Sequence, residues 1–276
     1  MRGWKGTAML KKNITGFIVV GCALTMVFAK DVGDEARLLT VDYAGKQQCS
    51  YLAEYTSQGS FTQKGIVSKK STSVRCVLFL SAAGPKRLSI KADSIFVGSD
   101  VFDEKMQKDL RKTLKKATYS LSLEHGFPEI DSASVIPTAG YAAWDLYRHL
   151  SKLLPALPDK PVKPGFTWER TVTLPLQTTR GIVSCETYRS YVFSKLQGDT
   201  ATVNWQFTYS AGKKPGGSDL SKDVPVSGKG KGWALIDIAR HCVLSAGMDF
   251  TTPVAALGDV SVTWIERAEF SLVGCK

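Results

Sequence analysis

The sequence has few residues of the kinds that catalysis, metal binding and nucleotide binding need. Its three histidines do not stand at the spacing of a zinc site or a catalytic triad. No G-x-S-x-G motif is present, so the sequence lacks a nucleophile elbow. The glycine cluster from Gly212 to Ser218 lacks the lysine that a P-loop places after its second glycine. We therefore expect no catalytic residues, no metal ligands and no cofactor, and a protein that is not an enzyme.

Charged residues are missing from one stretch near the N-terminus. Two lysines precede an uncharged run from Ile14 to Ala29, which is typical of a signal peptide spanning residues 1–29; Met9 is an alternative start. The run is shorter than the ~17 to 25 residues of a spanning helix. Residues 30–276 are therefore expected to be exported to the periplasm or cell envelope without a transmembrane span. Alternatively, Cys22 follows a lipobox-like sequence and anchors the protein through lipid.

Cysteine is scarce, and no two of the six cysteines form a C-x-x-C pair, which argues against zinc and thioredoxin-like sites. Five cysteines follow the predicted signal peptide, so at least one is unpaired or bonds to another molecule. In an exported protein cysteines are first of all disulfide candidates. The sequence predicts the links Cys49–Cys76 and Cys185–Cys242, each joining strands within one half of the chain.

Acidic residues are outnumbered by basic ones, with 25 Asp and Glu against 36 Lys and Arg and a net charge of +11. This balance favours contact with an anionic lipid, glycan or polymer surface. No basic motif of a known nucleic-acid-binding fold is present, so nucleic acid is not expected as a partner.

Alternation of apolar and polar residues dominates the chain and predicts a mainly β (α+β) fold. From Ala201 to Tyr209 every odd position is apolar and every even position is polar. From Val260 to Leu272 most even positions are apolar, and a strand of that length spans on the order of 40 Å. Such long strands are typical of a large curved antiparallel sheet or half-barrel. The same pattern predicts further strands at 36–43, 48–56, 62–68, 74–81, 87–97, 117–124, 167–175, 182–194, 226–238 and 241–250.

Two stretches have a helical period instead. Residues 103–116 begin with a capping aspartate, and residues 142–154 end at a proline; each has apolar side chains on one face. We expect one or two helices packed on the sheet. The Pro-rich segment 155–165 follows. It either joins two lobes, 30–154 and 166–276, or is a loop within a single β-rich domain.

The end of that segment carries a short recognisable motif. Residues 157–168 read LPDKPVKPGFTW, which resembles the P-V-K-x-G-[DE]-x-W stretch of uncharacterised exported bacterial envelope proteins with a domain of unknown function. Phe166 stands where that group commonly has an acidic residue. The resemblance implies export but no activity. Pro164-Gly165 also predicts a type II turn, with Trp168 starting a strand that faces the core. The predicted sheet is similar in fold to half-barrel lipoprotein carriers, which is an analogy of fold alone.

The predicted inner faces of the strands are rich in aromatic residues. Side chains of this kind either line a pocket for an apolar or amphiphilic ligand or fill a core. The candidates are Trp168, Trp205, Tyr209, Trp233, Trp264 and Phe270. The leading hypothesis is a non-enzymatic envelope protein, lipoprotein-like in fold, that binds lipid or another amphiphile in a concavity of the sheet. The alternatives are a structural or interaction module that contacts other envelope components and, third, an enzyme.

Two charges, Arg170 and Glu266, interrupt otherwise apolar rows. Because a buried lone charge is costly, each is expected to find a partner, reach the rim of the sheet or face a wet cavity. Mutual pairing inside the concavity would make these two residues the holders of a ligand's polar head. A bulge or a strand end that turns both side chains into solvent is the alternative.

Overall fold

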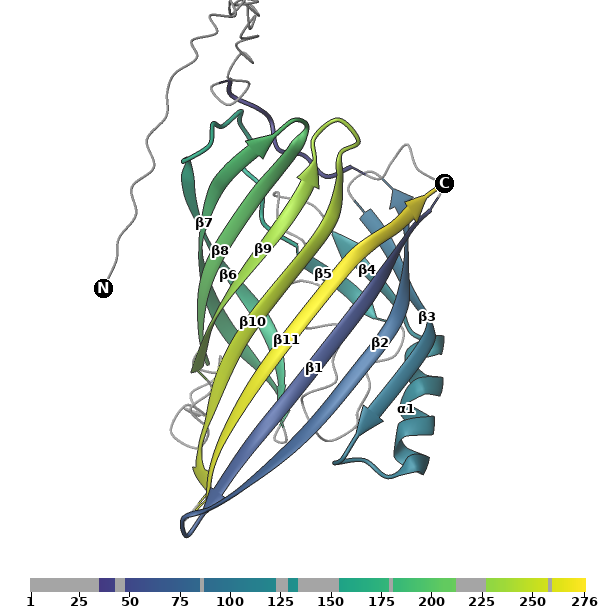
Figure 1. Cartoon of the computed structure of the whole chain (residues 1–276), viewed down its shortest axis with the longest axis vertical. Helices are drawn as coiled ribbons and strands as arrows, with labels where there is room; N and C mark the ends of the chain where they lie inside the picture. Colours follow the sequence, from purple (N-terminus) through teal and green to yellow (C-terminus); the bar gives the residue numbers. More distant parts are fainter. Residues whose placement is uncertain are drawn as a thin grey trace, which may run out of the picture. The chain divides into compact units, whose positions relative to one another are not determined.

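The computed structural model describes residues 35–42, 48–84, 87–122, 129–133, 154–178, 181–211, 227–257 and 260–276 (Figure 1). The predicted signal peptide, 1–29, lies outside these residues. The described strands form one 11-stranded antiparallel sheet in the order β5-β4-β3-β2-β1-β11-β10-β9-β8-β7-β6. The prediction of a mainly β, antiparallel fold is confirmed. The strands are β1 (Cys49–Gln63), β2 (Ile66–Gly84), β3 (Arg87–Ser99), β4 (Thr118–Ser122), β5 (Glu129–Ala133), β6 (Thr167–Thr178), β7 (Gly181–Gln197), β8 (Thr200–Ala211), β9 (Ser227–Asp237), β10 (Cys242–Leu257) and β11 (Val260–Cys275).

The sheet consists of two meanders that meet at its centre. Strands β1 to β5 follow one another outward on one side, and β6 to β11 follow one another inward on the other. The first strand, β1, then pairs with the last, β11, from Cys49↔Cys275 to Gln63↔Val260 (Figure 1). Both halves of the chain therefore contribute to one continuous sheet. Its outermost strands, β5 and β6, are not paired with each other, so the described sheet is not closed.

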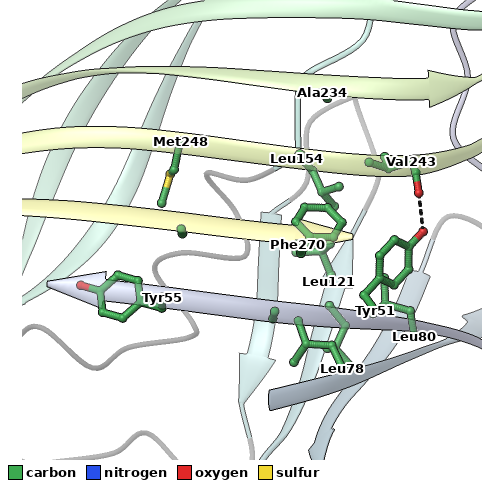
Figure 2. Packing of buried hydrophobic residues seen from close by; sticks show 14 of the residues in the cluster. Tyr51, Tyr55, Leu78, Leu80, Leu121, Leu154, Ala234, Val243, Met248 and Phe270 are labelled. Carbon is green, nitrogen blue, oxygen red and sulfur yellow. Dashed lines mark hydrogen bonds between the residues drawn. The ribbon is translucent and has the colours of Figure 1, made fainter. Parts of the chain in front are cut away.

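In the strands that form the core, alternate residues point to one buried face, because successive side chains in a strand lie on opposite sides. On β8 the apolar residues at odd positions from Ala201 to Tyr209 are all buried. We call this side of the sheet the inner face. In Figure 1 the sheet curls so that β4, β5 and β6 lie behind the central strands. Figure 2 shows part of the core on the inner face, with the hydroxyl of Tyr51 directed toward the backbone oxygen of Val243.

Two ends of the sheet can be distinguished. At one end, which we call the base, the segment 35–42 lies against the segment 154–166. Arg37 and Val162 exchange two backbone hydrogen bonds of 2.8 Å, and the side chain of Leu39 is buried in the core. The predicted strand at 36–43 is therefore wrong, since this segment forms only the bridge Arg37↔Val162. The opposite end, which carries the β1–β2 turn, we call the tip.

One helix, α1 (Glu104–Lys116), is present in the described part of the chain and packs against β3. The carboxylate of Asp103 accepts a hydrogen bond of 2.7 Å from the backbone N–H of Met106, which caps the first turn. Leu110 and Leu114 are buried, so the predicted amphipathic helix at 103–116 is confirmed. The second predicted helix, 142–154, lies outside the described residues except for Leu154. Within the described ranges no helix has the length and apolarity needed to span a membrane.

The disulfide joins the first strand to the last. Cys49 at the start of β1 bonds to Cys275 at the end of β11. The predicted link Cys49–Cys76 is wrong, because Cys76 pairs with Ala53, four residues further along β1, and keeps a free thiol. A disulfide is typical of an oxidising, extracytoplasmic compartment.

The predicted link Cys185–Cys242 is also wrong. The backbone of Cys185 pairs with Ala211 at the tip end of β8. Cys242 pairs with Asp237, which faces Thr200 at the base end of the same strand. At ~3.3 Å per residue, the length of β8 puts the two positions roughly 35 Å apart, far beyond the reach of a disulfide. The side chain of Cys185 itself lies outside the described residues.

Candidate ligand-binding face

One row of directly paired residues crosses nearly the whole inner face and contains its buried charges. We call it the polar row. Each member is the Cα partner of the next, so all of them lie on the same side of the sheet. From β6 to β3 the row reads Arg170, Arg189, Phe207, Gly230, Phe250, Glu266, Ser57, Thr72 and Ser99.

Arg189 and Glu266 are the two buried charges of the polar row. Arg189 is 0% exposed and Glu266 is 8% exposed. The Nη1 atom of Arg189 donates a hydrogen bond of 3.5 Å to the hydroxyl of Tyr191, and its guanidinium carbon lies 5.9 Å from the centre of the Phe207 ring. Three strands separate the two charges, a path of roughly 19 Å along the sheet at ~4.8 Å per strand. A cation and a carboxylate thus flank an aromatic stretch in the middle of the inner face.

Arg170 lies at the rim of the sheet, which is one of the three alternatives expected from the sequence. It lies on the edge strand β6 and is only half-buried, and its Nη1 atom donates to the backbone oxygen of Glu169 at 3.1 Å. Four strands lie between Arg170 and Glu266, so the hypothesis that these two residues pair with each other is wrong. Arg189 was not among the predicted site residues. On β7 the alternate residues Thr187, Tyr191 and Phe193 are buried, and Arg189 occupies an inward position in the same alternation. That alternation was the sequence signal that could have identified Arg189.

Trp168 and Trp205 belong to an aromatic ladder beside the polar row. The rings of Trp168 and Tyr191 stack at 5.3 Å with 7° between their planes, and Trp205 follows at 6.0 Å from Tyr191. Trp168 donates from Nε1 to the backbone oxygen of Ala156 at 2.7 Å. The buried Nε1 atom of Trp205 has no hydrogen-bond acceptor among the described residues. The ladder therefore presents one indole N–H without an acceptor on the inner face.

Glycines on β9 lie beneath the aromatic rings of β8. Gly230 pairs with Phe207 and Gly232 pairs with Trp205. A Cβ atom on Gly230 would lie 2.5 Å from Cζ of Phe207, and one on Gly232 would collide with the Trp205 ring. The rings lie flat on the backbone because these positions have no side chain. The glycines at alternate positions from 228 to 232 therefore relieve crowding between β8 and β9.

Trp233 and Trp264 lie on opposite faces of the sheet. Trp233 is 37% exposed and covers Gly247, where a Cβ atom would lie 2.7 Å from its Nε1 atom. Since its neighbours Gly232 and Ala234 face inward, Trp233 faces outward, and its predicted place on the inner face is wrong. Trp264 lies on the inner face over Gly59, half-buried, with its ring 5.7 Å from Phe61. Trp264 thus lies nearer the tip than Trp168 and Trp205 do.

One cysteine of the inner face, Cys76, lies on β2. Burial raises the pKa of the Cys76 thiol to about 12, which keeps this inward-facing side chain protonated and unreactive. Among the residues that the structure describes, no group of three or more His, Cys, Asp or Glu side chains is placed to hold a metal ion.

Comparisons with known proteins show the fold and no family. No family model and no curated protein matches the sequence. A lipovitellin structure that concerns lipid–protein interactions is similar to 85% of this chain, with a TM-score of 0.51 and 11% identity. The similar part is 26% of the lipovitellin chain, so this protein spans about a quarter of its length. A structure of OpdQ from Pseudomonas aeruginosa covers 83% of this chain at 8% identity, with a TM-score of 0.21 that carries no argument. The described sheet therefore shares its fold with a segment of lipovitellin.

Proposed function

We propose that this protein is a non-enzymatic exported protein that binds an apolar or amphiphilic ligand, such as a lipid, on the inner face of its sheet. One observation carries the proposal: an unclosed sheet presents aromatic and aliphatic side chains along the described part of its inner face, with a buried cation and a buried carboxylate in the middle. Concave sites of this composition, mostly apolar with a few polar groups, are typical of ligand binding.

The polar row and the ladder beside it suit the polar part of an amphiphile. Ser57 Oγ and Trp205 Nε1 are buried and have no hydrogen-bond partner within the described ranges. An unsatisfied buried donor costs about 1 to 3 kcal/mol, which a ligand oxygen would offset by accepting a hydrogen bond. Arg189, on the strand next to Trp205, adds a positive charge on the same face. A ligand whose head carries acceptor oxygens, such as a carboxylate, phosphate or ester, fits this set of donors.

Two further observations support the proposal. The fold is shared with a segment of lipovitellin, for which lipid–protein interactions have been described. The disulfide Cys49–Cys275 favours the exported setting in which an envelope lipid would be met.

The direct test is to purify the protein from its own envelope and to analyse it by native mass spectrometry and lipid extraction. We expect a lipid in defined stoichiometry. After its removal, a fluorescent fatty acid and a fluorescent phospholipid should be titrated back, and at least one should bind saturably. Absence of both a co-purifying lipid and saturable binding would refute the proposal and favour the alternative of a structural or interaction module.

A matched pair of variants locates the binding face. Trp264→Leu removes a half-buried ring from the inner face, whereas Trp233→Leu removes a ring of the same kind from the outer face. We expect Trp264→Leu to weaken ligand binding about fivefold through lost apolar contact, and Trp233→Leu to leave it unchanged. Equal effects of the two variants would mean that the ligand does not bind on the inner face.

A further inference from the structure

At the tip of the sheet, a regular β-hairpin extends beyond the core. β1 and β2 are joined by Lys64 and Gly65, whose φ angles of 48° and 80° are those of a two-residue type I′ turn. Pairing continues without interruption to the last pair, Gln63↔Ile66. All residues from Ile66 to Ser71 are nevertheless exposed. The hairpin therefore keeps its strand geometry while both of its faces meet solvent.

Two branched aliphatic side chains stand at the end of this hairpin. Ile66 is 75% exposed and Val67 is 57% exposed, and as successive strand residues they point to opposite faces. Paired strands at the rim of a sheet usually carry polar side chains on a solvated face. Two adjacent exposed aliphatic side chains, one on each face, therefore point to contact with an apolar partner.

The charged side chains of the hairpin itself are all basic. Lys64, Lys69 and Lys70 lie on the same hairpin and are exposed, and no acidic residue occurs between Gln58 and Val74. Asp100, which follows the neighbouring strand β3, is engaged with the hairpin: its carboxylate accepts hydrogen bonds from the backbone N–H and the hydroxyl of Ser71 at 2.6 and 3.3 Å. Exposed aliphatics within a cluster of lysines match the two layers of an anionic membrane surface, which are phosphate groups outside and acyl chains beneath.

We propose that the β1–β2 hairpin docks this protein on an anionic lipid bilayer, with Ile66 and Val67 entering the interface and the three lysines contacting lipid phosphates. Figure 1 shows that this hairpin reaches the lower end of the sheet. The half-buried rings of Phe61 and Trp264 lie on the inner face directly behind it. The docked hairpin therefore places the aromatic inner face next to the bilayer. The proposal does not depend on ligand binding by that face.

The test is co-sedimentation of the full protein with vesicles of phosphatidylglycerol and phosphatidylcholine in equal parts, and with vesicles of phosphatidylcholine alone. We expect the protein to bind the anionic vesicles. Because salt screens the attraction between lysines and lipid phosphates, this binding should weaken as the salt concentration is raised from roughly 0.1 to 0.5 M. The double substitution Lys69→Gln with Lys70→Gln should lower the partition coefficient about fivefold for each lysine. Ile66→Ser with Val67→Ser should lower it roughly tenfold without changing its salt dependence.

Matched controls stand at the base end of the same sheet. Val273, on β11, is 68% exposed, so Val273→Ser removes an equally exposed aliphatic side chain far from the hairpin. Lys91→Gln with Lys195→Gln removes two exposed lysines near the base. Both controls should bind vesicles as the wild type does. Wild-type protein that binds neutral and anionic vesicles equally, or hairpin variants that bind no more weakly than the base variants, would overturn the proposal. Ligand titrations in solution, which need no bilayer, report separately on the inner face.

Discussion

The hydroxyl of Tyr51 on β1 donates a hydrogen bond of 2.9 Å to the backbone oxygen of Val243 on β10, across the intervening strand β11 (Figure 2). The pairing of β10 with β9 shifts register between Val243 and Ser245, and the pairing of β10 with β11 begins only at Ser245. The carbonyl of Val243 therefore lies beyond the β11 ladder, and Tyr51 satisfies it. This bond ties together the two meanders of the sheet inside the core.

Tyr51→Phe tests that connection. The substitution keeps the ring but leaves a buried backbone oxygen without this donor, so we expect the free energy of unfolding to fall by about 1 to 2 kcal/mol. Denaturant unfolding measures the change. Tyr188→Phe, which alters an exposed tyrosine on the outer face, is the control and should change stability by less than about 0.5 kcal/mol. A Tyr51→Phe protein as stable as the control would show that water replaces the tyrosine hydroxyl.

Reduction of the Cys49–Cys275 disulfide should destabilise the protein strongly. The two cysteines are separated by 226 positions, so the bond closes a loop that includes the whole sheet. Restricting so long a loop in the unfolded chain contributes up to ~5 kcal/mol in the chain-entropy model. We expect Cys49→Ser with Cys275→Ser to lower the unfolding free energy by about 2 to 5 kcal/mol, measured without reductant. Cys76→Ala keeps the disulfide and serves as the comparison. In a thiol titration, the denatured variant should give one reactive thiol fewer than the denatured wild type, whereas the two folded proteins should give the same number.

Trp205→Ala should be costly, and Trp233→Ala should not. The Trp205 side chain is buried over Gly232, and its removal leaves a cavity, for which we expect a loss of about 3 to 5 kcal/mol. Trp233 is partly exposed on the other face and should cost less than about 1 kcal/mol. Thermal and denaturant unfolding of the two variants measure the difference. A similar loss in both would contradict the assignment of the two faces.

Arg189→Met tests the role of the buried cation in the polar row. Replacing a buried charge by an apolar side chain of similar length is often neutral for stability, so we expect the variant to fold. Its affinity for an anionic amphiphile should fall about tenfold, while its affinity for a neutral one of equal chain length should not change. Arg170→Met removes the half-buried arginine of the same row at the sheet edge and should alter neither affinity. Equal loss for charged and neutral ligands would show that Arg189 does not contact the head.

Stability should depend on pH through Asp237 at the turn between β9 and β10. Burial alone would raise the pKa of this carboxyl, but hydrogen bonds from the backbone N–H and Nε of Arg240, at 2.8 and 2.6 Å, together with the arginine charge, bring it below its ordinary value of 3.8. Because the folded pKa is the lower one, the stabilisation is present above about pH 4 and is lost as pH falls through the folded pKa. Asp237→Asn should therefore destabilise the protein at pH 7 and have less effect near pH 2. An equal loss at both pH values would rule out the charge as the cause.

The sequence by itself determined the elements whose signals are local. The period-two alternation at 201–209 and 260–272 became β8 and β11, because side-chain direction along a strand depends only on the strand itself. Asp103 predicted the start of α1 through its own carboxylate. Gly165, with a φ of 90° and a hydrogen bond of 3.0 Å from Phe166 N–H to the Lys163 oxygen, forms the predicted type II turn.

Only the tertiary structure decided which strands became neighbours and, with them, the site. Cys49 bonds to Cys275 because β1 pairs with β11, a contact between the two ends of the chain that no local pattern encodes. The same register puts Arg189, rather than Arg170, into the interior of the polar row. Trp233 stands in a run of apolar residues where alternation cannot assign a face, and the close pairing of Gly232 with Trp205 turns it outward. Register joins residues hundreds of positions apart, so it follows from the packing of the whole sheet and not from the sequence of any one strand.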